Sequence, residues 1–488
     1  MGPRAVGRLP RMMLAAAAFV IGVLTCAVGG AEERSSTPLS WDTGEGKSYW
    51  IPALEIGGFI VGLNQFNRHA LSSNDYDTDA DTFWKNLRTA PVYDKDPFSV
   101  NQIGHPYQGS IYYGFARSAG LEYWQSLIYT LGGSFLWETY GETTPPSSND
   151  YVSTTIGGSF IGEAAFRMAS LVLEGGGDRP GFWREVAAAL ISPSTGFNRL
   201  VFGERFKPVF PSRDPEIFVR LRIGATVTRE VTNEGLSDNV KRQEGSLDYS
   251  ITYGLPGKPG YRYTRPFDYF HFEFTAVPNS DTVGNAIENA SVRGLLVGER
   301  YQGGDDYRGV WGFFGGYDYL SPQIFRVATT NVGLGTVGQW WMSRTIALQS
   351  ALVGGVGFGA AGTVADRAER DYHYGVIPQA LVGLRLIFSE RAMLEGAVRQ
   401  YFVIGTGSGP GPSTSDFGAE RITRANVGFT VRLFGPHALG VQYLVTARDA
   451  RIAGGPDRHQ SVDTFSVSYN FLGHTRFGAS EWRPGEAR

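Results

Sequence analysis

Four polar side chains around one predicted turn have the types and spacing for acid–base chemistry. Glu138 and Glu142 stand one helical turn apart and share a helix face, two prolines then break the helix, and Asp150 begins the next one. His105 precedes a proline at a predicted helix start and can be brought to the same place. A histidine beside carboxylates in a partly apolar setting is a reasonable acid–base pair for hydrolysis, because burial moves their pKa values toward neutral pH. The candidate catalytic residues are therefore His105, Glu138, Glu142 and Asp150.

The same residues have structural explanations that need no catalysis. Asp150 lies in a first helical turn, where a carboxylate complements the helix dipole. Glu142 is placed to end a helix in solvent, and Glu138 to accept hydrogen bonds from Thr154 or Thr155. The sequence leaves both explanations open.

Other chemistry is less well supported. His271 and Glu273 stand two residues apart on one predicted strand. Both are therefore expected to face the barrel lumen, in a hydrogen-bond network. No third ligand follows them at a metal-binding spacing. The sequence also has no nucleophile elbow, phosphate-binding glycine loop or zinc helix motif. We therefore expect no metal ion and no cofactor.

The helices that must position the four candidates nearly repeat each other. "GGSFLWE" at Gly132–Glu138 returns as "GGSFIGE" at Gly157–Glu163, with the proline break between them and Ser147 as a natural N-cap. Two antiparallel helices would set the Gly-Gly-Ser triplets face to face, because glycine permits close approach. Within the second helix, the glutamate of the repeat is expected to pair with Arg167. A third Gly-Gly-Phe segment, Pro52–Leu63, is a candidate to pack alongside.

Beyond about residue 216 the apolar residues alternate instead. In "EIFVRLRIGATVT" and "RANVGFTVRLF" one face is apolar and the other carries Gly, Thr and Arg, which is typical of strands. Many segments reach ten residues, the length that a tilted strand needs to cross a bilayer. We count about twelve such strands, an even number, as single-chain bacterial barrels require. A soluble all-β domain is the alternative, but the strand length and the polar face favour a transmembrane barrel.

The N-terminus and the composition agree with export. Residues 1–31 have a positive start, an apolar stretch and small residues for cleavage, as in a signal peptide. Cys26, the single cysteine of the 488 residues, lies inside this segment, so a cysteine-based metal site or disulfide is excluded from the mature chain. The net charge of −3 argues against nucleic acid as a partner. Abundant glycine (65 residues) and 13% aromatic residues suit a closed, lipid-facing sheet.

The segment Asn101–Arg167 resembles a family. Its matching features are "HPY" from His105, "WE" ending at Glu138, "PSSND" ending at Asp150 and the later "GE". These motifs are similar to those of a bacterial family of predicted outer-membrane proteins that carry a domain of unknown function. The resemblance implies a barrel with an N-terminal helical block and says little about chemistry.

Taken together, these patterns predict a mainly β protein with an α part: an outer-membrane β-barrel of about twelve strands, preceded by a helical block. The predicted parts are a signal peptide (1–31), an N-terminal helix and linker (32–100), a helical hairpin block that plugs the barrel or forms a periplasmic layer (101–210), the barrel (211–473) and a polar tail (474–488).

Two functions fit this organisation in the bacterial outer membrane. The first is a non-enzymatic envelope or small-solute role, with outer-membrane lipid and a small solute in the lumen as partners. The alternative is a lipid-modifying enzyme, an acyl hydrolase or transferase that uses the His/Glu/Asp cluster.

Overall fold

The structure is a computed structural model that describes residues 37–71, 74–94, 96–177, 179–232, 241–277, 286–322, 324–364, 369–407, 418–452 and 457–480. The predicted signal peptide and residues 481–488 lie outside the described residues. The chain divides into two compact units between Ser212 and Arg213, a helical unit and a strand unit.

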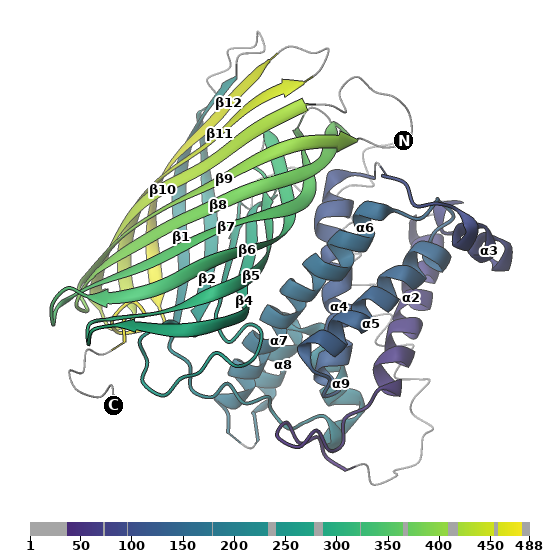
Figure 1. Cartoon of the computed structure of the whole chain (residues 1–488), viewed down its shortest axis with the longest axis horizontal. Helices are drawn as coiled ribbons and strands as arrows, with labels where there is room; N and C mark the ends of the chain where they lie inside the picture. The colour runs from purple at the N-terminus through teal and green to yellow at the C-terminus, as the bar shows by residue number, and fades with distance from the viewer. Residues whose placement is uncertain are drawn as a thin grey trace. The chain divides into compact units, whose positions relative to one another are not determined.

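The first unit is helical (Figure 1). Several helices are interrupted by wide π-type turns, here η3, η4 and η5. The described elements are α2 (Trp50–Leu71), η2 (Asn74–Tyr76), α3 (Ala80–Arg88), η3 (Val100–Gly104), α4 (His105–Ser118), α5 (Tyr123–Leu136), η4 (Trp137–Gly141), α6 (Ser148–Val152), η5 (Ser153–Gly157), α7 (Gly158–Glu174), α8 (Phe182–Ile191), α9 (Pro193–Val201) and η6 (Gly203–Arg205). As expected, Ser147 caps α6: its hydroxyl accepts a hydrogen bond from the Asp150 N–H.

Helix α4 is the central helix of this unit. It is buried along most of its length and packs against α2, α5, α7 and α9. The expected contact between the two Gly-Gly-Ser triplets is wrong, because α4 supplies the facing surface for both. A Cβ built on Gly158 would lie 2.7 Å from Gly109 Cα, and one built on Gly133 would lie 2.6 Å from the Tyr112 ring. Periodicity indicated close packing, but it could not identify the partner helix.

One helical stretch, Ser148–Glu174, has the length and hydropathy of a membrane span. Its most apolar window is 72% buried, as expected for a core helix of the helical unit. We therefore treat it as part of that unit's core.

The second unit is a closed antiparallel barrel of twelve strands, which confirms the predicted fold class. Neighbours in sequence pair in order, and β1 pairs with β12 to close the sheet. The strands are β1 (Ile217–Thr232), β2 (Lys241–Tyr253), β3 (Phe270–Ala276), β4 (Ile287–Gly303), β5 (Tyr307–Leu320), β6 (Phe325–Trp341), β7 (Ile346–Thr363), β8 (Tyr372–Phe388), β9 (Ala392–Gly407), β10 (Gly418–Phe434), β11 (His437–Ile452) and β12 (Arg458–Leu472).

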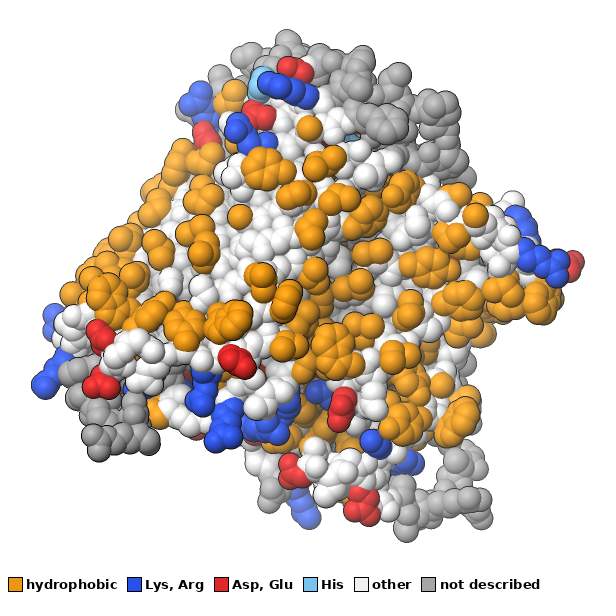
Figure 2. All heavy atoms as spheres, in the orientation of Figure 1, with side chains coloured by type: hydrophobic (Ala, Val, Ile, Leu, Met, Phe, Trp, Pro, Cys, Tyr) orange, Lys and Arg blue, Asp and Glu red, His pale blue; other side chains and the backbone are white. Residues whose placement is uncertain are grey.

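The alternation in the sequence corresponds to the two faces of this barrel. On β12, Val467 and Phe465 are about half exposed, while Asn470 is fully buried. Similar apolar side chains cover the strands in Figure 2, and charged side chains lie mainly toward the strand ends. The inner face therefore carries the polar and charged residues, and the barrel surface is apolar.

We expect Gly158→Ala to destabilise the helical unit. The added methyl group would press on the α4 backbone at Gly109 and Pro106, and such overpacking costs about 1–3 kcal/mol. This corresponds to a fall of roughly 2–12 °C in the melting temperature of the helical circular-dichroism signal. Gly132→Ala is the matched control: nothing lies within 4 Å of its added Cβ, so it should be neutral or slightly stabilising. Equal losses in the two variants would contradict the proposed α4–α7 contact.

Candidate functional site

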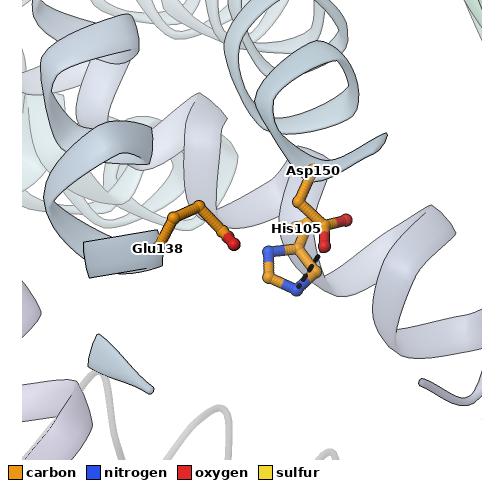
Figure 3. A group of neighbouring side chains, drawn as sticks. All are labelled: His105, Glu138 and Asp150. Atoms are coloured by element: carbon orange, nitrogen blue, oxygen red, sulfur yellow. Dashed lines mark ion pairs between the residues drawn. The ribbon is translucent and has the colours of Figure 1, made fainter. Parts of the chain in front are cut away.

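Three of the four candidate residues meet inside the helical unit. His105 begins α4, Glu138 lies in η4, and Asp150 lies in α6. One ligand-type atom from each lies within 4.8 Å of the others, and His105 Nε2 is 3.9 Å from Asp150 Oδ2. The imidazole lies between the two carboxylates (Figure 3). All three residues are at most 4% exposed, so the cluster is a buried polar site.

Each member of the cluster adjoins a π-type turn. Turn η3 leads directly into His105, η4 contains Glu138, and η5 follows the short helix that carries Asp150. Such wide turns are rare and occur frequently at functional sites. The sequence predicted the helices and the proline break, but not these turns.

Hydrogen bonds orient the two carboxylates. Glu138 Oε2 accepts from the Ser147 N–H at 2.7 Å, and Asp150 Oδ1 accepts from Asn149 Nδ2 at 3.0 Å. The expected bond from Thr154 or Thr155 to Glu138 is wrong: both hydroxyls are buried without a partner among the described residues. The N-capping backbone of α6 is the partner instead.

Glu142 does not join the other three. Its carboxylate accepts from Trp137 Nε1 at 3.0 Å and from the Thr144 hydroxyl at 3.2 Å. The expectation that it ends a helix in solvent therefore needs correction, because the side chain is only partly exposed and bonds to its own turn. Glu142 still acts on the cluster through its charge.

Burial and like charges perturb all four groups in the same sense, toward the neutral form. Burial raises the pKa of Glu138, and the charge of Glu142 adds to this effect. Burial, then Asp94 and Glu138, raises the pKa of Asp150. Burial lowers the pKa of His105, against a smaller opposing effect from Asp94. Burial, with Asp96 and Asp94, raises the pKa of Glu142 to about 8. The sequence reading missed Asp94, which follows an irregular stretch with no periodic pattern.

Glu163 shows how the same unit neutralises a different buried carboxylate. Its oxygens accept from Arg167 Nε at 2.7 Å and from Arg117 Nε at 2.8 Å. Burial alone would raise its pKa, but Arg117 and Arg167 lower the pKa of Glu163. The pairing with Arg167 is as expected, whereas Arg117 comes from α4, 46 residues away in sequence.

A second candidate site lies in the barrel lumen. A cavity of about 150 Å³ is lined by residues from both sides of the barrel. Its ionisable lining consists of Arg220, Arg222, Arg293, Arg385, Arg399, Arg424, Glu273, Glu395 and His271. Arginine is therefore the dominant charged residue of this cavity. The expected pair His271 and Glu273 both line it, and His271 Nδ1 lies 3.0 Å from the Thr252 hydroxyl.

Most lumen arginines are held by carboxylates. Arg222 donates to Asp248 at 2.8 Å, and Arg399 donates to Glu273 at 3.0 Å. Asp318 accepts from both Arg293 and Arg399. Arg424 has no carboxylate within ion-pair distance among the residues that the structure describes. With Asp248 and Asp318 included, six arginines face four carboxylates, so the cavity has a positive surplus.

Residues 474–480 occupy one end of the lumen. Trp341 Nε1 donates to the Ser480 carbonyl at 3.1 Å, and Gln349 Nε2 donates to the Gly478 carbonyl at 2.9 Å. Phe477 is completely buried. It joins an apolar cluster made of Phe218, Leu255, Trp341, Ala347, Ile387, Met393, Ala438, Leu472, Phe477 and Ala479. Part of the segment expected as a polar tail thus packs against inward-facing barrel residues near the end where β12 finishes.

Comparisons with known proteins support the helical block as a recognised domain. Residues 90–194 match the family described as Domain of unknown function (DUF3943), a range that includes all four candidate residues. The resemblance in the sequence is thereby supported at the level of an uncharacterised family. No curated protein matches the chain.

Solved structures similar to the chain are barrels. The monoaromatic hydrocarbon channel CymD is 12% identical, with a TM-score of 0.21 over 54% of this chain and 90% of that one. An outer membrane channel from Pseudomonas putida F1 is 8% identical, with a TM-score of 0.28 over 54% and 97%. An anion-selective porin from Comamonas acidovorans is 8% identical, with a TM-score of 0.20 over 52% and 99%. Similarity this low transfers neither a solute nor an activity to this chain.

We predict that stability falls as pH rises from about 4.5 to about 8, in part because of Glu142. Below its ordinary value of 4.5 the carboxyl is protonated in both states; above that value the unfolded chain releases a proton that the folded chain retains until about pH 8. Glu142→Gln should flatten this fall. The full shift would cost about 5 kcal/mol, and the partial exposure of Glu142 to solvent reduces the expected penalty to about 1–2 kcal/mol. That corresponds to roughly 2–8 °C between the two ends of the range. Melting curves of wild type and variant across this range test it, and identical slopes would contradict it.

Proposed function

We propose that the protein is a bacterial outer-membrane barrel that binds and passes small anionic solutes through its arginine-rich lumen. The observation that carries the proposal is the cavity in which six arginines face four carboxylates. A surplus of fixed positive charge in a narrow, partly desolvated passage attracts anions and repels cations.

The membrane location rests on the strands. Most of them have more residues than the 9–11 that a tilted strand needs to cross the hydrocarbon region; β7, for example, has 18. Their outward side chains are apolar, and closure by β1 and β12 leaves no edge strand to be satisfied by water. The short turns and the end of β12 lie at one end of the barrel, which would face the periplasm.

The apolar cluster around Phe477 implies that passage is restricted. Its residues come from several strands, including β1 and β12, and lie near the end of the barrel where β12 finishes. Charged solutes cross such an apolar constriction poorly, since it offers them no hydrogen bonds. We infer that the lumen holds a solute readily but conducts only when residues 474–480 move.

The alternative of a lipid-modifying enzyme has weaker support. His105, Glu138 and Asp150 do converge, which an acid–base site requires. Yet each is at most 4% exposed, so a lipid carbonyl would not reach them without rearrangement of the helices. The cluster is therefore better explained as a buried site that binds something smaller.

We propose that the helical unit binds the membrane surface. Helices α2 and α5 leave large apolar side chains exposed at helical spacing: Trp50, Leu54, Val61, Trp124, Ile128, Leu131 and Phe135. A face of this kind, with tryptophan at its margin, suits the boundary of a bilayer.

The membrane location predicts a specific penalty at Val467. This side chain is 51% exposed on the outside of β12. If it faces lipid, Val467→Arg should make folding into lipid vesicles less favourable by about 2–4 kcal/mol near the bilayer midplane. Val467→Leu is the control and should fold as wild type. Equal stability of the arginine variant would place this face of the barrel in water and refute the proposal.

The anion proposal predicts that selectivity depends on Arg424. In planar bilayers, the barrel truncated after residue 473 should conduct more than the full chain and should prefer anions. In that truncated background, Arg424→Gln should shift the reversal potential toward cations, because it removes a lumen charge without breaking an ion pair.

Arg421→Gln is the matched control, since Arg421 lies three residues away on β10, is exposed, and pairs with Asp449. It should leave the reversal potential unchanged. A truncated barrel that prefers cations, or one that conducts no more than the full chain, would contradict the proposal.

A further inference from the structure

We propose that His105, Glu138 and Asp150 form a binding site for one divalent transition-metal ion in the helical unit, with Mn²⁺ and Zn²⁺ as the candidates. The three residues come from α4, η4 and α6, which are separate in sequence, and their donor atoms already lie within 4.8 Å of one another. This site is independent of solute passage through the barrel.

The distances require only a small contraction. With metal–ligand bonds of about 2.0–2.2 Å, neighbouring ligand atoms lie roughly 3–3.5 Å apart. His105 Nε2 and Asp150 Oδ2 are 3.9 Å apart, so this pair needs a shift of well under 1 Å. No pair of ligand atoms is more than 4.8 Å apart, a separation that carboxylate rotation with a shift of roughly 1 Å would close. The site is thus nearly assembled.

The hydrogen bonds leave the donor atoms free for an ion. Ser147 N–H holds Glu138 Oε2, and Asn149 holds Asp150 Oδ1, so each carboxylate is oriented through one oxygen. The other oxygen of Asp150, Oδ2, has no hydrogen-bond partner among the described residues. Bonds of this kind, from outside the ligand set, fix the orientation of ligands in known metal sites.

Unpartnered buried atoms are the independent observation that points to a ligand. Besides Asp150 Oδ2, His105 Nδ1 is buried without a hydrogen-bond partner in the part of the chain that the structure describes. The two residues are 1% and 4% exposed, so bulk water cannot readily serve these atoms. Buried polar atoms in native proteins are nearly always satisfied. An ion bound between Asp150 Oδ2 and the His105 ring would give the Asp150 oxygen the partner it lacks.

Charge balance supports the same conclusion. Among the described residues, no arginine or lysine forms an ion pair or a hydrogen bond with Glu138 or Asp150. Glu163, buried in the same unit, has two arginines. Buried carboxylates are normally paired with a cation, coordinate a metal or keep a proton. Glu138 and Asp150 lack the first of these, so a metal ion or a bound proton must neutralise them.

The ligand types select the class of ion. Calcium and magnesium prefer sites made of oxygen alone, whereas one imidazole with two carboxylates suits Mn²⁺, Fe²⁺ or Zn²⁺. Because the site is buried and joins three chain segments at their π-type turns, its expected effect is to fasten the helical unit.

The test uses the full chain, purified without a metal-affinity tag in detergent, then stripped with chelator. Titration with MnCl₂ or ZnCl₂ should load about one ion per chain and raise the melting temperature of the helical signal. His105→Gln, Glu138→Gln and Asp150→Asn should each weaken binding at least 10-fold. Glu142→Gln is the comparison variant, because this neighbouring carboxylate bonds Trp137 and is not a ligand. It should still load about one ion per chain and should change the affinity much less than the three ligand variants, since only its charge beside Glu138 is lost.

A spectroscopic readout separates coordination from simple stabilisation. Mn²⁺ bound to the wild-type chain should show nitrogen coupling from one imidazole in pulsed electron paramagnetic resonance, and His105→Gln should abolish it. This measurement on the wild type is decisive even if a variant fails to fold. Absence of stoichiometric binding of either ion, or binding that all three variants retain, would overturn the proposal.

Discussion

Closure of the barrel is the constraint on which the arrangement of the strand unit depends. Each strand pairs on both sides, and the register of β1 with β12, for example Gly224 opposite Ser468, completes the ladder. Without that pairing, two strands would present unsatisfied backbone groups, which hydrocarbon does not tolerate. Closure also fixes the faces: once Val467 points outward, its neighbours on β12 must point inward. The pairing register of the strands therefore determines that the arginine side chains point into the lumen.

The two units neutralise buried charge differently. In the lumen, cations are in surplus, and carboxylates such as Asp318 bridge two arginines at once. In the helical unit, Glu163 is neutralised by Arg117 and Arg167. Glu138 and Asp150 have no arginine partner of either kind, although burying their carboxylates carries the same desolvation penalty. This difference distinguishes a carboxylate that holds helices together from the pair to which we assign a metal ion.

The sequence predicted what depends on local periodicity and failed on what depends on partners far along the chain. The alternation of apolar and polar residues predicted the barrel, and the proline break followed by Ser147 predicted the start of α6. The partner of Gly158 is Gly109, and Phe477 fills the lumen; neither has a signal in the sequence near it. Of the four candidate site residues, three converge. Glu138 and Asp150 lie close because they flank the same turn, whereas His105 is brought to them by the packing of α4, which has no signal in the local sequence. The prediction that Glu142 joins the cluster was wrong for a local reason: its carboxylate accepts a hydrogen bond from Trp137, which helical spacing cannot reveal.

The π-type turns argue that the cluster is more than packing. A wide turn inserts a residue into the helix and loses regular hydrogen bonding, so it is rarely kept without a compensating gain. Here η3, η4 and η5 adjoin His105, Glu138 and Asp150 respectively. Apolar residues on regular helices would fill the same space with less strain and no desolvation cost. Three irregular turns and three buried polar residues occur together here. Such a combination is expected where binding or chemistry, rather than stability, selects the residues.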